Sequence, residues 1–125
     1  MKKMIGMLGL LMSCQAVAAP TNCGESITTL DIMRCEGRQL EQAERALNLA
    51  YGRVMKELAG PQIHEREART LLRKAQRNWV AFREQDCAAK VAAVGGGSLQ
   101  GVVRIGCMRE HAEIRTRQLH AFRQH

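Results

Sequence analysis

Two breaks in an otherwise continuous helical pattern constrain the fold of this chain most strongly. Gly60-Pro61 ends one long segment rich in helix-forming residues, and Gly95-Gly96-Gly97 ends a second. Proline lacks the amide hydrogen that a helix interior needs, and three successive glycines lose too much backbone entropy to stay helical. Proline occurs elsewhere only at position 20. We therefore expect three long helices that fold back on one another at these two breaks.

Apolar residues recur every three or four positions in each long segment, which indicates one buried face per helix. The expected core faces are Leu40, Ala43, Leu47, Ala50, Val54 and Leu58; then Ala68, Leu72, Ala75, Trp79 and Phe82; then Ile105, Met108, Ala112, Leu119 and Phe122. We expect the second helix to end near Val94 and Ser98 to cap the third. A short helical turn is expected from Ile27 to Met33. The predicted fold class is all-α, a small antiparallel bundle of three long helices plus a short N-terminal helix.

The N-terminus has the pattern of a secretory signal peptide. Two lysines precede an apolar run over residues 4–12, and small residues follow at Ala16 and Ala18. The run is shorter than the about 20 apolar residues that a membrane-spanning helix needs. We expect cleavage after Ala18, so that residues 1–18 are the signal peptide and 19–125 form one helical domain. This predicts a periplasmic or secreted protein.

A second route of maturation stays open at the same place. Leu11-Met12-Ser13-Cys14 resembles the lipobox of bacterial lipoproteins, in which the cysteine is acylated and becomes the new N-terminus. A lipid on Cys14 would anchor the protein to a membrane. No other feature of the chain predicts membrane attachment.

Four cysteines remain in the expected mature domain: Cys23, Cys35, Cys87 and Cys107. An even number in a small exported domain predicts a disulfide framework. Zinc is the alternative, but no pair has the close CxxC spacing of a structural zinc site, so no metal is expected. Cys87 and Cys107 each lie ten positions from Gly97, which brings them abreast in an antiparallel hairpin. Of the three possible connectivities, this symmetry ranks Cys87–Cys107 with Cys23–Cys35 first.

The polar residues match no known catalytic motif. A serine triad needs a nucleophile, a base and an orienting acid in one site, and the only serines of the expected mature domain are Ser26 and Ser98. His64-Glu65 begins like a zincin motif but lacks the second histidine. We expect no catalytic residues and no cofactor, and hence a protein that is not an enzyme.

The charge is basic but mixed. Removal of the signal peptide takes away two of the 19 lysines and arginines, which leaves 17 against 12 acidic residues and a net charge of +5. Glu110 and Glu113 interrupt the arginines of the last helix, and the aromatic residues are assigned to the core, so no nucleic-acid partner is expected. Anionic polymers of the envelope are a partner class that suits the charge.

Three stretches carry a resemblance to a known family. The first stretch contains Cys23, Cys35, Leu47-Asn48 and Tyr51. The second contains Ala75-Gln76-Arg77, Trp79, Phe82-Arg83 and Cys87. The third contains Gly96-Gly97-Ser98, Cys107, Arg115 and Leu119. Together they resemble the lysozyme inhibitor LprI N-terminal domain family, over about Cys23 to Leu119. The resemblance implies a helical, disulfide-bonded exported domain that binds lysozyme.

Most of these shared residues have a structural interpretation. We expect Asn48 and Gln76 to form a buried polar bridge between two helices, and Arg83 to pair with Asp86 one turn away. The loop Gly95-Gly96-Gly97-Ser98 is the candidate binding loop, because a small flexible tip can enter a carbohydrate cleft.

Two hypotheses for function follow. The first is a protein that binds a lysozyme-type hydrolase by surface complementarity, without help from net charge, since animal lysozymes are themselves basic. The alternative is a structural envelope factor that binds an anionic wall polymer or another envelope protein and inhibits nothing. The sequence does not set the oligomeric state.

Overall fold

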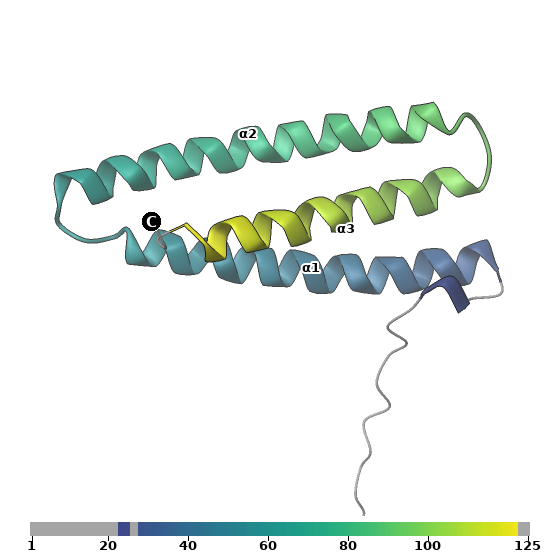
Figure 1. Ribbon diagram of the computed structural model, residues 1–125, viewed down its shortest axis with the longest axis horizontal. Helices are drawn as coiled ribbons and strands as arrows, with labels where there is room; N and C mark the ends of the chain where they lie inside the picture. The colour runs from purple at the N-terminus through teal and green to yellow at the C-terminus, as the bar shows by residue number, and fades with distance from the viewer. Residues whose placement is uncertain (1–22, 26–27, 123–125) are drawn as a thin grey trace, which may run out of the picture.

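Three long helices in an up-down-up order make up the protein. The computed structural model describes residues 23–25 and 28–122. They form a short 3₁₀ turn η1 (Cys23–Glu25) and the helices α1 (Thr29–Glu57), α2 (Ile63–Ala93) and α3 (Leu99–His120). Figure 1 shows α2 antiparallel to the other two and α3 next to both, so that α1 and α3 run in the same direction. The predicted all-α bundle is confirmed.

The core lies mainly between α1 and α3. Five residues of the predicted stripe on the first helix are buried, together with one from α2 and two from α3: Ala43, Leu47, Ala50, Val54, Leu58, Leu72, Ala112 and Leu119. Small residues let the two helices approach closely. Ala112 has no exposed surface, and a Cβ added to Gly101 would lie 2.6 Å from the Met33 side chain. Small residues on α3 thus allow its close packing against α1.

The predicted core face of α2 is only partly correct. Leu72 is buried and Trp79 packs against the core, but Ala75 is exposed and the Phe82 side chain is 58% exposed. Arg83 takes the buried position instead, at 8% exposure. The reason is that α2 packs mainly against α3 alone, so its buried face is narrower than an apolar stripe implies.

The start of α1 also differs from the expectation. Helix α1 begins at Thr29 and continues without a break, so the separate turn expected from Ile27 to Met33 is instead its first turn. The Thr28 hydroxyl caps it by accepting a hydrogen bond from the Asp31 N–H at 3.1 Å.

Ile27, residues 1–18 and Cys14 lie outside the described residues. Within the described part, no helix has the length and apolarity needed to cross a bilayer.

The turn between α2 and α3 depends on its glycines. Gly95 and Gly97 have φ angles of 74° and 112°, which side-chain-bearing residues rarely adopt. Ser98 occupies the N-cap position of α3, but its side chain makes no capping bond. The Gln100 side chain bonds the Gly95 carbonyl oxygen instead. The break at the triglycine was thus correctly predicted, and the cap was not.

Candidate functional site

A disulfide joins the two arms of the α2–α3 hairpin. Cys87 and Cys107 are bonded with their Cα atoms 5.7 Å apart, and both are buried. A second disulfide, Cys23–Cys35, attaches η1 to α1 with a Cα separation of 5.6 Å. These are the two pairs that symmetry about Gly97 ranks first. The Cys87–Cys107 bond crosses the half of the hairpin that is nearer the candidate binding loop.

The hairpin tip, Gly95 to Ser98, is fully accessible. All four residues are exposed, and a Cβ built on any of the three glycines meets no atom within 4 Å. In Figure 1 the tip lies at one end of the bundle, beyond the last turn of α2 and the first turn of α3. The sequence therefore places a small, unhindered loop on a covalently fixed support.

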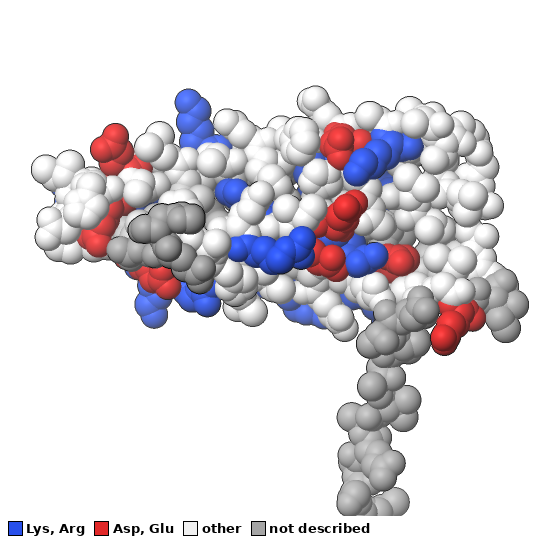
Figure 2. Space-filling view, in the orientation of Figure 1, with Lys and Arg blue, Asp and Glu red and all other residues white. Residues whose placement is uncertain are grey.

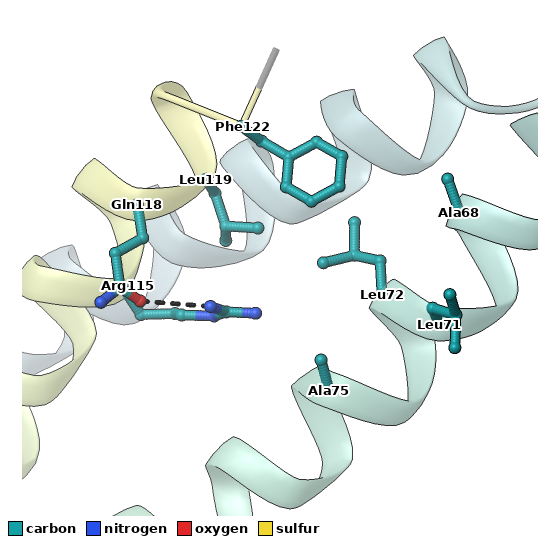
Figure 3. A pocket seen from close by; sticks show the side chains of 8 residues that line it. All are labelled: Ala68, Leu71, Leu72, Ala75, Arg115, Gln118, Leu119 and Phe122. Carbon is teal, nitrogen blue, oxygen red and sulfur yellow. Dashed lines mark hydrogen bonds between the residues drawn. The ribbon is translucent and has the colours of Figure 1, made fainter. Parts of the chain in front are cut away.

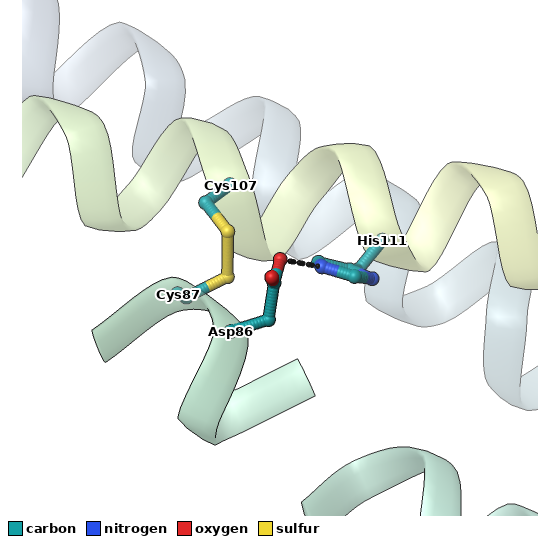
Figure 4. A group of neighbouring side chains, drawn as sticks. All are labelled: Asp86, Cys87, Cys107 and His111. Atoms are coloured by element: carbon teal, nitrogen blue, oxygen red, sulfur yellow. Dashed lines mark hydrogen bonds and ion pairs between the residues drawn. A yellow bond between two sulfur atoms is a disulfide. The ribbon is translucent and has the colours of Figure 1, made fainter. Parts of the chain in front are cut away.

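A polar cluster that the sequence did not predict surrounds the Cys87–Cys107 bond. The Nε2 atom of His111 donates a hydrogen bond to the Asp86 carboxylate at 2.8 Å (Figure 4). The Phe82 ring lies edge-on to the imidazole. The His111 side chain is only 14% exposed. The available signal was its spacing, four residues after Cys107 on one helix face, with Asp86 beside Cys87.

Four potential metal-ligand atoms meet in this cluster. Those of Asp86, Cys87, Cys107 and His111 lie within 4.8 Å of one another. Metal coordination by cysteine requires the thiolate, and here both sulfurs are bonded to each other. In the oxidised protein the cluster therefore offers a carboxylate and an imidazole, and it acts as a second link between α2 and α3.

The Asp86–His111 link predicts an acid-dependent loss of stability. The hydrogen bond from His111 is the main cause that holds the pKa of Asp86 below its ordinary value of 3.8; partial desolvation opposes it, and Lys90 adds to it. A pKa lowered by folding means that the ionised carboxylate stabilises the folded state above about pH 4. This contribution is lost as the pH falls through the folded-state pKa.

We therefore expect the urea midpoint of the wild-type protein to fall below about pH 4 more steeply than that of Asp86→Asn. Measurement of both midpoints from neutral pH down to pH 2 tests this. Equal slopes for the two proteins would contradict the role given to Asp86.

Two polar pairings expected from the sequence are wrong. Arg83 bonds Glu44 of α1 at 2.5 Å, rather than Asp86, and its guanidinium lies 4.7 Å from the centre of the Trp79 ring. Asn48 is exposed, since it follows the buried Leu47 and points to another side of the helix. The buried polar bridge between Asn48 and Gln76 is therefore absent.

Gln76 has a different partner. Its amide oxygen accepts a hydrogen bond from Nε of Arg115 on α3 at 3.0 Å. Tyr51, the remaining residue of the shared motif, is partly buried and packs against the core. Most of the motif residues thus connect helices, which agrees with their structural interpretation.

A groove between α2 and α3 lies at the other end of the bundle. It has a volume of about 360 Å³, and its lining combines six apolar side chains with two polar ones: Ala68, Leu71, Leu72, Ala75, Leu119, Phe122, Arg115 and Gln118. Figure 3 shows the Arg115 side chain extending from α3 toward Leu72 and Ala75 of α2. The groove exists because α2 leaves part of its apolar face uncovered.

The charged side chains do not form a continuous basic surface on the face shown in Figure 2, where acidic and basic groups lie next to one another. Several of them are paired across helices, such as Arg104 with Glu84 at 2.8 Å and Arg109 with Glu36 at 3.0 Å. On this face, the described residues form no basic stripe of the kind that nucleic-acid binding uses.

Comparisons with known proteins find a family and a relative that match most of the chain. Residues 21–119 match the family described as lysozyme inhibitor LprI. An uncharacterized protein of Rhizobium meliloti (strain 1021) is 28% identical over 123 residues, which cover 90% of this chain and 88% of the relative. No solved structure matches. Because the matched region covers most of the sequence, both disulfides and the hairpin included, the chain belongs to the lysozyme inhibitor LprI family.

Proposed function

We propose that this protein is exported and binds a lysozyme-type peptidoglycan hydrolase by surface complementarity, with the tip Gly95 to Ser98 as its main contact. The observation that carries the proposal is the family match over residues 21–119. The geometry supports the choice of the tip, because it is exposed and its support is held by the Cys87–Cys107 bond. A fixed support reduces the entropy lost when a loop is ordered on binding.

The mode of action that we propose is steric rather than catalytic. A glycoside hydrolase places its two catalytic carboxyl groups on either side of the bond that it cleaves, inside a cleft. A tip without large side chains can enter such a cleft and exclude the sugar chain. The four cysteines of the described residues are bonded in pairs and so supply no thiolate nucleophile.

Gly96 gives the sharpest test of this proposal. Unlike its neighbours it has no positive φ angle, and a side chain added there meets open space, so Gly96→Tyr should fold normally. We expect the oxidised wild-type protein to slow at least one lysozyme type, and Gly96→Tyr to raise its inhibition constant about tenfold or more, which corresponds to about 1.4 kcal/mol.

The matched control is Gly52→Tyr. Gly52 lies on α1 near the opposite end of the bundle, and a Cβ there also meets no atom within 4 Å. This variant should inhibit like the wild type. If no lysozyme type responds, or if both tyrosine variants inhibit equally, the tip is not the inhibitory element.

The same samples address the alternative of an envelope factor. Co-sedimentation with isolated cell wall, together with unchanged lysozyme rates, would favour binding of an anionic polymer by a protein with net charge +5 in its expected mature form. The mass of the N-terminal peptide of the exported protein distinguishes cleavage after Ala18 from acylation of Cys14.

A further inference from the structure

Arg115 differs from the other arginines that link helices because no carboxylate of the described residues pairs with it. Arg83 bonds Glu44, and Arg109 bonds both Glu36 and Glu113. The polar partners of Arg115 are two neutral amide oxygens, that of Gln76 at 3.0 Å from Nε and that of Gln118 at 3.1 Å from Nη1.

The pKa values of Arg109 and Arg115 shift in opposite directions. Burial by itself would lower the pKa of Arg109, but its hydrogen bonds to Glu113 and Glu36 outweigh that effect and raise it. For Arg115, burial lowers the pKa and no acidic group opposes the shift. Among the described residues, Arg115 is therefore a partly desolvated cation without a counter-charge.

The surroundings of this cation are apolar. Leu72, Ala75, Leu119 and Phe122 line the groove into which the guanidinium extends, and the Leu71 side chain at the rim is 59% exposed (Figure 3). A planar guanidinium matches a carboxylate through two parallel hydrogen bonds. An apolar groove with a guanidinium group at its side is complementary to a molecule with an apolar tail and one anionic head.

The size of the groove favours a small molecule over a protein. Its volume of about 360 Å³ lies at the lower end of the roughly 300–1,000 Å³ typical of small-molecule sites. Eight residues line it, whereas a stable protein interface uses about 20–30 residues a side. The groove is lined by the first half of α2 and the C-terminal end of α3, whereas the hairpin tip joins the end of α2 to the start of α3. The two proposed sites therefore share no residue.

We propose that the groove between α2 and α3 binds a free fatty-acid anion, with its carboxylate on Arg115 and its acyl chain against Leu72, Ala75, Leu119 and Phe122. Each methylene group that enters the groove should raise the affinity about fourfold, until the chain extends beyond Phe122. The carboxylate should contribute about tenfold or more, the strength of a hydrogen bond to a charged group.

The test compares decanoate with decanol by calorimetric titration of the oxidised protein, below the concentration at which either ligand forms micelles. We expect decanoate to bind the wild type at least tenfold more tightly than decanol, and Arg115→Met to remove that difference. Arg117→Met is the matched control, because Arg117 lies on an exposed position of the same helix and lines no part of the groove. It should behave as the wild type.

A second variant keeps the proposal testable if Arg115→Met fails to fold. Ala75 is exposed and lines the groove, so Ala75→Leu should fill the groove without straining the core. It should weaken decanoate binding about tenfold or more, and backbone amide shifts on binding should centre on residues 68–75 and 115–122.

Three results would overturn the proposal. One is equal affinity of the wild type for decanoate and decanol. Another is binding that Ala75→Leu leaves unchanged. The third is a dimer that Ala75→Leu dissociates while decanoate does not bind, since that result would assign the groove to a second copy of the chain.

Discussion

Replacement of Cys87 and Cys107 together by serine is expected to lower the free energy of unfolding by about 3 kcal/mol or more. The bond closes a loop with a sequence separation of 20, and loop-closure entropy for a loop of this size gives about that value. The serine hydroxyls would add a cost, because both positions are buried. Domains of this kind are stable by only about 5–15 kcal/mol, so urea unfolding should show a large shift of the midpoint.

The double variant Cys23→Ser with Cys35→Ser is the control for position. It also removes one disulfide, with a sequence separation of 12, but that bond ties η1 to α1 and not the hairpin. Hydrogen exchange should therefore become faster at the ends of α2 and α3 next to the tip only when the Cys87–Cys107 bond is removed. Equal protection of those amides in both double variants would show that the bond does not hold the tip.

The second large effect is expected at the ion pair between α1 and α2. Glu44→Ala should destabilise the protein by about 3 kcal/mol, because it leaves the buried guanidinium of Arg83 without its counter-charge. The side chain of Arg83 is 10% exposed, and its guanidinium also lies over the face of the Trp79 ring. Its Nε atom is buried without a hydrogen-bond partner among the described residues. Urea unfolding of the single variant measures this cost.

Two further variants separate the effect of burial from that of charge alone. Glu41→Ala removes an acid from the same helix, but its pair with Arg45 is exposed, so the loss should be at most about 1 kcal/mol. The double variant Glu44→Leu with Arg83→Met should recover much of the lost stability, since paired apolar groups often replace a buried ion pair at little cost. A loss for Glu44→Ala no larger than that for Glu41→Ala would contradict this account of the interface.

The sequence predicted the number of helices and both turns because these depend on local chemistry. Gly-Pro and triglycine end a helix wherever they occur, and the stripe that includes Leu47 and Val54 is regular enough to identify one face. The turn expected from Ile27 to Met33 was treated as separate from the helix that carries Leu40, whereas α1 runs through both without a break. The capping pattern of Thr28 and Asp31 marks the true start of this helix.

The side-chain pairings could not be predicted because they depend on how the helices are arranged. An apolar stripe does not say how wide the buried face is, so Phe82 was assigned to the core in place of Arg83. The partner of Arg83 lies 39 positions away on a different helix. Local spacing favoured Asp86 as the partner of Arg83, but Asp86 instead bonds His111 of α3, next to the disulfide. The groove at Arg115 arises from the same incomplete cover of α2.

The most direct test of the proposed function is complex formation between the oxidised protein and each lysozyme type, measured by sedimentation velocity. We expect a complex with at least one type. Gly96→Tyr should weaken this complex about tenfold or more, whereas Gly52→Tyr and the groove variant Ala75→Leu should leave it unchanged. The absence of a complex with every type, or a complex that Gly96→Tyr leaves intact, would contradict the claim that the hairpin tip binds a lysozyme-type hydrolase.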